Sequence, residues 1–411
     1  MKLPEKSVNA ILAPLVRGLF LHASGEAFAV VPGPGEKTAG ALDADIRDAV
    51  RDGLIDAEGA AAILRRTAEG AGKKLPSSVT VLAGGEPLGT YWADRTFDAA
   101  RSRMERRDPA PLAAAPAGTE DGEEGICPPG SSSRSRSDVV KNRVALVTGG
   151  AQGFGEEIVR GLAASGALVF IADLNAGGAA ELAGKINAAL GKTAALALAL
   201  DVSGEESAEE VFTAVAETAG GLDLLISNAG VLKAGSVLEQ DLRSFKFITD
   251  VNYTGYFIMA KHSGRLMRRQ SLTAPFWKTD IIQINSKSGL EGSNKNGAYA
   301  GGKFGGLGLT ESFALELIEY NIKVNAICPG NFFDGPLWSD PEKGLFVQYL
   351  NAGKVKGAKT PSDVRAFYEE KVPMKRGCCG PDVMRAIYYI VEQEYETGQA
   401  VPVTGGQVML H

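Results

Sequence analysis

Short apolar runs and amphipathic stretches alternate regularly over the last two-thirds of the chain. Runs of β-branched and other apolar residues, typical of buried strands, occur at 143–148, 168–172, 193–200, 222–227, 281–285 and 323–328. Segments with helical spacing lie between and after them, at 156–165, 181–190, 208–219, 253–269 and 299–320. Such alternation indicates a parallel sheet with helices on both faces, and right-handed crossovers favour the doubly wound arrangement. We therefore predict one α/β domain of the Rossmann type over residues 139–411.

The pattern before residue 107 is weaker. It predicts helices at 8–21, across 44–71 and at 97–106, and strands at 27–31, 79–83 and 89–92. We interpret residues 1–107 as a small α+β module, and no nucleotide loop, metal spacing or nucleophile motif assigns it a function. Residues 108–138 are rich in Pro, Gly, Ser and blocks of charge without apolar periodicity, which is typical of a flexible linker.

Composition narrows the class of protein. The 411 residues carry 43 Lys and Arg against 49 Asp and Glu, so the chain lacks the positive field of a nucleic-acid binder. Its three His residues are too scattered for a metal cluster, and none of its four Cys residues has C-x-x-C spacing. No apolar run is long enough to span a bilayer. The first residues have a faint signal-peptide outline that Pro14 and Arg17 interrupt, so we expect a cytoplasmic protein.

A glycine-rich turn directly follows the first strand of the α/β domain. Gly149 permits a sharp turn, Gly153 lets a pyrophosphate approach the backbone, and Gly155 allows close packing of helix on strand. Gln152 and Phe154 belong to the same turn. The free N–H groups of the helix that begins here attract an anion. The position of the turn, between a strand and a helix, predicts a dinucleotide site.

Other candidate cofactor contacts lie at the carboxyl ends of later strands, where open α/β sheets bind ligands. Asp173 ends the second strand, so its carboxylate would accept hydrogen bonds from the ribose hydroxyls of NAD and repel the 2′-phosphate of NADP. The alternative for Asp173 is a cap for the next helix. The remaining contacts expected at these ends are Leu174, Asp201, Val202, Asn228, Ala229 and Gly230.

Tyr299 and Lys303 are spaced i, i+4, which places both on one face of a helix. A phenol with a pKa near 10 is a poor base at neutral pH, and we expect the neighbouring Lys303, together with the cationic nicotinamide, to lower the pKa of Tyr299. Ser286 ends the fifth strand, where its hydroxyl would hold the reacting oxygen beside Tyr299. Asn252 precedes the long helix at 253–269 and would anchor a water chain to Lys303.

Together these motifs resemble the short-chain dehydrogenase/reductase family over 139–411. The resemblance implies a catalytic tetrad of Asn252, Ser286, Tyr299 and Lys303, with Tyr299 as general acid/base. Tyr299 and Lys303 would also bind the cofactor, as would the loop that contains Pro329, Gly330, Asn331 and Phe332. One departure is Asp334, which stands where the family often has a Thr that binds the carboxamide; backbone groups of Asn331 and Phe332 would replace it.

The family forms dimers and tetramers, and the glycine-rich helix after Tyr299 predicts a subunit interface, because so many Gly residues would weaken an isolated helix. We therefore expect a homo-oligomer, a homotetramer or a dimer. No nucleic acid, membrane or metal is expected as a partner.

A narrower resemblance, over 282–289, 303–306, 371–377 and 403–409, is to the sorbitol-6-phosphate dehydrogenases of this family. It implies an NAD-dependent interconversion of D-sorbitol 6-phosphate and fructose 6-phosphate. Lys287 and Lys295 are candidate phosphate ligands, or else solvated lysines. Trp338 lies in a segment, 331–346, that we interpret as a substrate lid. Three alternatives stay open: a dehydrogenase of another polyol or sugar alcohol, a non-catalytic NAD-binding regulatory protein, and a bifunctional enzyme.

Overall fold

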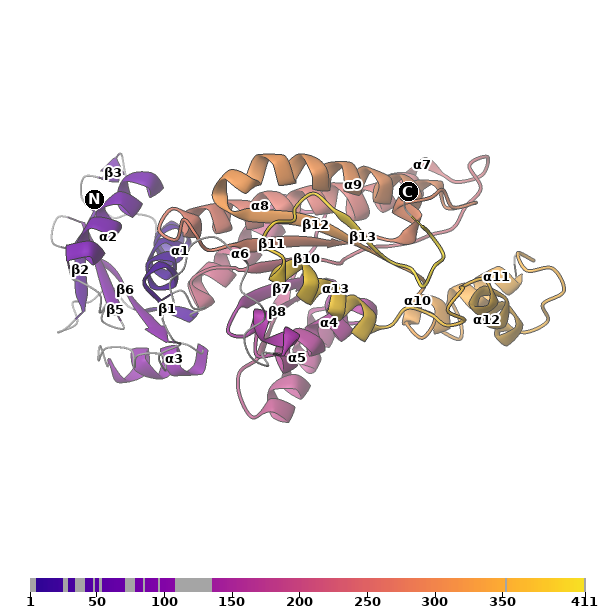
Figure 1. Ribbon diagram of the computed structural model, residues 1–411, viewed down its shortest axis with the longest axis horizontal. Coiled ribbons are helices and arrows are strands. Elements are labelled where there is room, and N and C mark those ends of the chain that lie inside the picture. Colours follow the sequence, from indigo (N-terminus) through magenta and orange to yellow (C-terminus); the bar gives the residue numbers. More distant parts are fainter. Residues whose placement is uncertain are drawn as a thin grey trace, which may run out of the picture.

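The computed structural model describes residues 5–24, 29–33, 41–46, 49–51, 54–70, 78–83, 86–94, 97–107, 135–351 and 353–409. Most of the predicted linker therefore lies outside the described residues. The larger part of the molecule begins with the short helix η2 (Arg136–Val140), and Val140 is buried against it. Figure 1 shows the two parts side by side, with the N-terminal module at one end.

Seven parallel strands form the central sheet, six of them predicted by the alternation of apolar runs. In chain order they are β7 (Val144–Thr148), β8 (Leu168–Asp173), β9 (Ala195–Ala199), β10 (Leu224–Ser227), β11 (Thr279–Ile284), β12 (Ile322–Pro329) and β13 (Ala400–Val403). Their order across the sheet is β13-β12-β11-β10-β7-β8-β9, which is doubly wound. The pattern did not predict β13, a strand of four residues with little burial.

Helices cover both faces of this sheet, because successive residues of a buried strand point to opposite sides. On β7, Val144 and Leu146 belong to one apolar cluster and Ala145 and Val147 to the other. The first cluster includes side chains of α6 (Glu205–Ala219), α8 (Gly255–Ser271) and α9 (Gly297–Leu317). The second includes side chains of α4 (Gly153–Ala164), α5 (Ala176–Leu190) and α13 (Gly380–Glu392).

Shorter helices surround the carboxyl edge of the sheet. Apart from η5 (Ile318–Tyr320), which precedes β12 at the amino edge, they are α7 (Leu242–Thr249), the single π-helical turn η3 (Asp250–Thr254), η4 (Lys287–Gly289), α10 (Pro336–Ser339), α11 (Leu345–Asn351) and α12 (Pro361–Glu370). The last three build a small separate core around Phe333 and Trp338. This part, which we call the lid, stands out beyond the sheet in Figure 1.

The N-terminal module has α+β structure, as its pattern predicts. It consists of α1 (Glu5–Ser24), β1 (Ala29–Gly33), β2 (Leu42–Asp45), β3 (Val50–Arg51), β4 (Leu54–Ile55), α2 (Ala57–Gly70), β5 (Ser78–Ala83), β6 (Glu86–Asp94) and α3 (Phe97–Arg106). The helix predicted from residue 44 is wrong there. Ala44 and Ile46 are buried and Asp43 is exposed, a period of two that makes β2 a strand.

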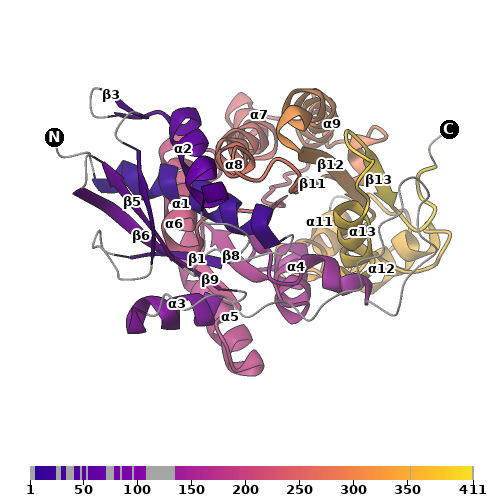
Figure 2. The same cartoon turned by 60° about the vertical axis from the view of Figure 1, so that its left-hand side comes forward.

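The module is docked on the α/β domain through α1, which lies against α6 and α8 (Figure 2). Arg17 of α1 and Asp223, just before β10, form an ion pair at 2.6 Å in which both side chains are 0% exposed. Although burial acts to raise it, the pKa of Asp223 is held below its ordinary value by Arg17 beside it. Asp223 also accepts the backbone N–H of Val144, at 2.8 Å, so this pair joins the module to the first residue of β7.

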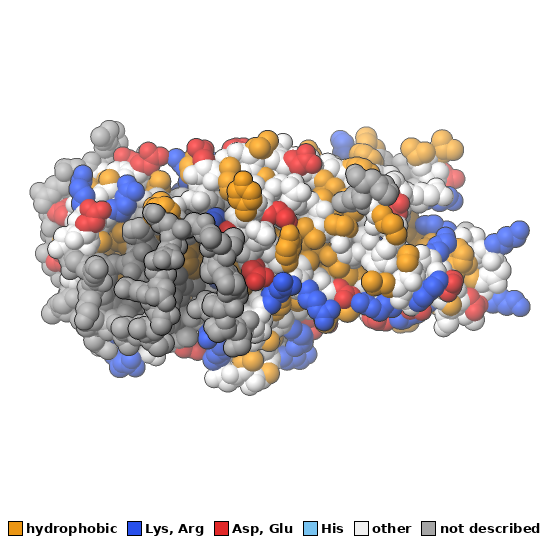
Figure 3. Space-filling view, viewed as in Figure 1, with side chains coloured by type: hydrophobic (Ala, Val, Ile, Leu, Met, Phe, Trp, Pro, Cys, Tyr) orange, Lys and Arg blue, Asp and Glu red, His pale blue; other side chains and the backbone are white. Residues whose placement is uncertain are grey.

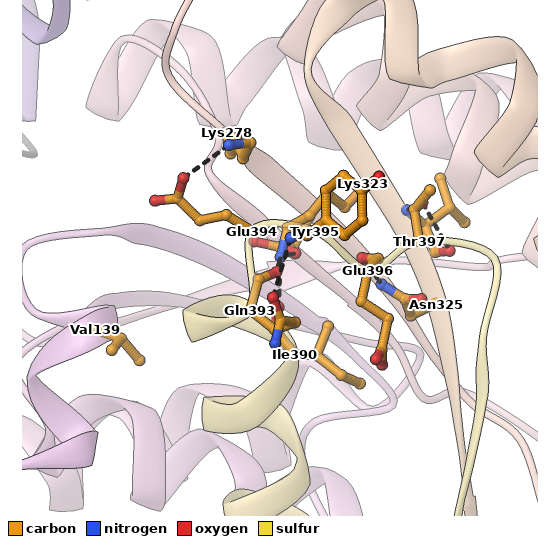
Figure 4. Close-up of polar contacts among 12 residues, drawn as sticks. Val139, Lys278, Lys323, Asn325, Ile390, Gln393, Glu394, Tyr395, Glu396 and Thr397 are labelled. Carbon is orange, nitrogen blue, oxygen red and sulfur yellow. Dashed lines mark hydrogen bonds and ion pairs between the residues drawn. The ribbon is translucent and has the colours of Figure 1, made fainter. Parts of the chain in front are cut away.

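A second buried pair lies at the same amino edge of the sheet. Nζ of Lys323 lies 2.9 Å from Oδ1 of Asp280, and both side chains are 1% exposed. Lys323 also donates to the carbonyl oxygens of Ile390 and Gln393, while Lys278 pairs with Glu394 at the surface (Figure 4). Burial raises the pKa of the Asp280 carboxyl. The amino edge therefore buries its charges in opposite-sign pairs.

Candidate active site

The glycine-rich turn forms a cradle at the carboxyl end of β7. Gly149 and Gly153 have φ of +61° and +60°, a conformation that favours glycine. A side chain at Gly155 would collide with the carbonyl of Gly149, so only glycine fits between helix and strand. The amide of Asn228 donates to the carbonyl oxygens of Thr148 and Gly149, at 3.0 Å each, which fixes the turn from β10.

The shape of the cradle fits a dinucleotide. α4 begins at Gly153. The side chain of its N-cap residue, Gln152, does not bond the first N–H groups of the helix. A Cβ at Gly153 would meet only Pro336, at 3.8 Å, which shows that the space beside the turn is open. Backbone donors facing an open space at a helix start suit a pyrophosphate.

Asp173 lies beside this turn. Its carboxylate accepts the backbone N–H groups of Ala151 and Asn175, both at 2.9 Å. The cap of α5 is Asn175, whose side chain accepts the N–H of Gly178, so the alternative role of Asp173 as that cap does not hold. The adjacent Leu174 is 78% exposed. The carboxylate is thus held at the rim of the cradle, where a ribose would lie in this fold.

Two further predicted cofactor residues meet across the cradle. The rings of Phe154 and Phe332 stack with centroids 4.5 Å apart, so the turn after β7 contacts the loop after β12. Gly330 in that loop donates its N–H to Val403 of β13 at 2.9 Å. Pro329, the last residue of β12, and Asn331 flank Gly330.

Asp201 and Val202, two predicted cofactor residues, contact the elements that follow β9 and β10. Asp201 accepts hydrogen bonds from the N–H and hydroxyl of Ser203, at 2.9 and 2.6 Å, in the turn before α6. Val202 is buried and close to Gly255, where a Cβ would lie 3.0 Å from it. This contact fixes the start of α8.

Asn252 and Lys303 are brought together under Gly230. A Cβ at Gly230 would lie 2.8 Å from Oδ1 of Asn252 and 3.9 Å from Nζ of Lys303. Asn252 is in the π-helical turn η3, a distortion frequent at functional sites. Its side chain accepts the N–H of Val231 at 2.9 Å and donates to the Val231 carbonyl at 2.7 Å. Ala229, next to Gly230, donates its N–H to the hydroxyl of Thr148 at 3.0 Å.

Ser286 and Tyr299 complete the predicted tetrad. Ser286 caps η4 by accepting the N–H of Ser288 at 3.1 Å, and its hydroxyl also bonds the phenol of Tyr299. Lys303 donates to the carbonyl of Ile284 at 2.9 Å, and its ammonium lies 5.6 Å from the centre of the Tyr299 ring. All four side chains therefore converge at the carboxyl ends of β10 and β11.

Burial dominates the pKa of the Tyr299 phenol. Burial of the phenol raises its pKa above 10, and the hydrogen bond from Ser286 only partly opposes this effect. Lys303 lies over the ring rather than at the phenol oxygen, and burial lowers its own pKa to about 8. Burial is therefore the largest effect on the pKa of Tyr299 here, and the lowering expected from Lys303 together with the cationic nicotinamide stays a prediction.

The predicted substrate residues lie in three different environments. Lys287 faces Glu291 at 3.5 Å, and Lys295 is exposed with φ of +59°. Trp338 is buried in the lid, where its ring contacts Phe333 and Phe346 at 5.1 Å each. Its indole thus packs the lid interior.

Asp334, the departure from the family motif, forms an ion pair with Arg365 of α12 at 2.7 Å. This pair ties the loop after β12 to the lid. The carboxylate therefore has a structural partner in place of the cofactor contact that a Thr would make.

Sequence reasoning missed two residues close to the tetrad. Tyr349 of α11 lies near enough to Tyr299 to act on its pKa, and Asn296 hydrogen-bonds Tyr349. Asn296 stands directly before α9, three residues from Tyr299, so its position was a usable signal. Tyr349 belongs to a segment with no motif.

In the described part of the chain, no three His, Cys, Asp or Glu side chains gather in a way that could hold a metal ion. Nor does that part contain a helix long and apolar enough to cross a membrane.

Comparisons with known proteins agree with this geometry. Residues 143–338 match the family described as short chain dehydrogenase. Sorbitol-6-phosphate 2-dehydrogenase of Escherichia coli (strain K12) is 39% identical over 270 residues, which cover 65% of this chain and 99% of that protein.

Solved structures give the same result. The crystal structure of sorbitol-6-phosphate 2-dehydrogenase SrlD from Erwinia amylovora is 40% identical with a TM-score of 0.60, covering 65% of this chain and 100% of that one. A complex of RhlG with NADP from Pseudomonas aeruginosa is 25% identical with a TM-score of 0.57, covering 67% of this chain and 99% of that one. The resemblance seen in the motifs is confirmed: the chain belongs to the short-chain dehydrogenase family.

Proposed function

We propose that this protein is an NAD-dependent oxidoreductase that interconverts D-sorbitol 6-phosphate and fructose 6-phosphate in the cytoplasm. The observation that carries the proposal is the convergence of Asn252, Ser286, Tyr299 and Lys303 beside an open glycine cradle. The similarity to sorbitol-6-phosphate 2-dehydrogenases, over nearly their whole length, supports the substrate class.

Each tetrad residue has a distinct task in this proposal. The nicotinamide cofactor accepts a hydride during oxidation and donates one during reduction. Tyr299 takes the proton of the C2 hydroxyl while the C2–H bond breaks and a carbonyl forms, and it returns the proton in the reverse direction. Ser286, which lies beside the phenol, donates its single hydroxyl hydrogen to the same substrate oxygen and holds it beside Tyr299.

Lys303 and Asn252 support that proton transfer. Lys303 is fixed by the Ile284 carbonyl, so its ammonium stays beneath the tyrosine and can bind a ribose hydroxyl of the cofactor. Asn252 is held by both backbone groups of Val231 and carries the water chain that leads from Lys303 to solvent.

The preference for NAD rests on Asp173. Its carboxylate is held by two backbone N–H groups at the rim of the cradle and remains able to accept from ribose hydroxyls. A 2′-phosphate placed there would be repelled by like charge. A structural relative is known in complex with NADP, so NAD and NADP must both be assayed as cofactors of this protein.

We also propose that the protein is a homo-oligomer. Phe257 of α8 and Phe304 and Leu315 of α9 are exposed apolar side chains, and they are suited to packing against a second copy. Only some of the glycines of α9 are free to serve a subunit interface, although the sequence suggested that role for all of them. Gly305 and Gly306 are needed inside the subunit, where a Cβ would approach Tyr253 and Gln283, whereas Gly301 and Gly308 face open space.

The test is the formation of reduced cofactor by the purified full-length chain. Sorbitol 6-phosphate, free sorbitol and ribitol would be compared, each with NAD and with NADP. We expect the highest kcat/KM for sorbitol 6-phosphate with NAD. Equal rates on free sorbitol contradict the phosphate preference, and cofactor binding without turnover of any polyol indicates the regulatory alternative. Light scattering at micromolar concentration tests the oligomer; a monomer contradicts it.

A further inference from the structure

Two amide side chains lie between the end of β11 and α9. Gln283 belongs to β11 and Asn285 directly follows that strand, and the two residues are 2% and 3% exposed. Being two positions apart in extended backbone, they point to the same side. Figure 3 shows charged side chains spread over one face of the molecule, whereas these neutral amides are enclosed. A buried amide is costly unless its polar atoms are bonded, so its partners must be identified.

The side chain of Asn285 has three hydrogen-bond partners. Its Oδ1 accepts the backbone N–H of Ser286 at 2.8 Å. Its Nδ2 donates to the backbone carbonyl of Lys303 at 2.9 Å and to Oε1 of Gln283 at 2.8 Å. One side chain therefore joins the backbones of two tetrad residues that stand on different elements.

Lys303 is joined to the end of β11 a second time. Its Nζ donates to the carbonyl of Ile284 at 2.9 Å, while its own backbone carbonyl accepts from Asn285. Two consecutive residues thus hold both the ammonium and the backbone of one lysine, and both hydrogen bonds are buried. Because a buried network whose members are bonded is rigid, it fixes the position of α9 relative to Ser286.

Two glycines leave the space that these amides need. A Cβ at Gly289 would lie 2.2 Å from Oδ1 of Asn285, and a Cβ at Gly306 would lie 2.5 Å from Nε2 of Gln283. Neither glycine has a positive φ, so the backbone conformation does not require glycine at these positions. The space is required by the amides themselves, which shows that the surrounding chain is fitted to them.

We propose that Asn285 is a positioning residue for the reaction: its amide holds the Ser286 hydroxyl and the Lys303 ammonium in their places around Tyr299. The inference rests on the proposed function, in which Ser286 holds the reacting oxygen and Lys303 supports proton transfer. Asn285 itself contacts neither substrate nor cofactor and acts through the backbones of two residues that do. A misplacement of about 1 Å in a reacting group can lower a rate about 10²-fold.

The first test removes the amide. Asn285→Ala should lower kcat at least about tenfold and change KM less than about twofold, because alignment in the transition state is lost rather than binding. Asn325→Ala is the matched control. Asn325 is 1% exposed on β12 and bonds the backbones of Glu396 and Gln399, which are not part of the site. The control should lower the urea midpoint by a similar amount and keep kcat.

The second test displaces the amide without replacing it. In Gly289→Ala the new Cβ would push Oδ1 of Asn285 away from Ser286, so we expect the same kind of loss in kcat. Gly292→Ala is the matched control, since a Cβ there would meet nothing within 4 Å, and it should behave as wild type. In the double variant Asn285→Ala/Gly289→Ala the colliding atom is gone, so kcat should be no lower than in Asn285→Ala alone.

Binding of NADH, followed by its fluorescence, provides a readout that needs no turnover. Lys303 is proposed to bind a ribose hydroxyl of the cofactor, and Asn285 holds the backbone of Lys303. We therefore expect Asn285→Ala to raise Kd for NADH about threefold, the effect of weakening one hydrogen bond. Asn325→Ala should leave this Kd unchanged.

The outcomes distinguish this inference from the proposed function. If Asn285→Ala and Asn325→Ala lose similar stability and both keep kcat and Kd, Asn285 has only a structural role and the inference is overturned. Losses in kcat that add in the double variant also overturn it, because Gly289→Ala would then act by a separate route. If wild type turns over no polyol, the proposed function fails, and the difference in Kd for NADH between Asn285→Ala and Asn325→Ala alone decides the inference.

Discussion

The two edges of one parallel sheet bury charge in opposite ways. At the amino edge, Arg17 pairs with Asp223 and Lys323 with Asp280, each within 2.9 Å. At the carboxyl edge, Lys303 is 4% exposed and contacts a backbone carbonyl, with no carboxylate in ion-pair distance among the described residues. Charges that the protein neutralises itself stabilise the fold, whereas a charge left without a counterion remains available to ligands.

The strongest test of this contrast is Tyr299→Phe at the carboxyl edge. The substitution removes the hydroxyl that we propose as the proton-transfer group and leaves the ring in place. We expect kcat to fall about 10³-fold, with the free energy of unfolding changed little. Steady-state rates and urea unfolding would be measured together. A variant with full activity would falsify the proposed mechanism.

At the amino edge, Arg17→Met should act on stability. It leaves Asp223 buried without its counterion, so we expect a loss of about 3–5 kcal/mol in the free energy of unfolding. Arg268→Met is the matched control, because Arg268 also joins the two parts, through an exposed pair with Glu58 at 2.8 Å. That control should cost at most about 1 kcal/mol. Similar effects of both variants would contradict a special role for the buried pair.

The pH dependence of stability separates the edges further. Burial lowers the pKa of Lys303 to about 8, below its ordinary value in the unfolded chain. Between these two values the unfolded state binds more protons, so stability rises with pH there. We expect the ligand-free protein to gain about 2 kcal/mol relative to Lys303→Met as the pH rises from about 8 to about 10. Urea unfolding of both proteins at both pH values measures this difference. The same change in the free energy of unfolding with pH in both proteins would refute the prediction.

The smallest expected effect concerns cofactor choice. Asp173→Ser removes the carboxylate that faces the cradle, and we expect kcat/KM for NAD to fall about tenfold while the value for NADP rises, since a charged acceptor is lost. Asp201→Ser, at the end of the next strand, is a comparison variant in which the preference should stay. Unchanged cofactor preference in Asp173→Ser would show that other residues select NAD.

The sequence predicted the features that depend on short spacings. The glycine turn and the Tyr299–Lys303 pair are local patterns, and the sheet order follows from the alternation of strands and helices. The docking of α1 could not be predicted, because Arg17 and Asp223 are 206 positions apart and share no period. The lid residue Tyr349 was missed for a similar reason, since only tertiary packing brings it close enough to act on the pKa of Tyr299.

The contact of Arg17 with Asp223 has a consequence for how this protein can be divided. Its relatives of about the length of the α/β domain need no added module, so cutting the chain at residue 135 would seem to yield one of them. The cut would instead expose the Asp223 carboxylate without its Arg17 partner, beside the first residue of β7, the strand whose carboxyl end carries the glycine-rich turn. The pair thus ties the extension to the α/β domain, and moving the extension onto another α/β domain would require transferring both Arg17 and Asp223 together.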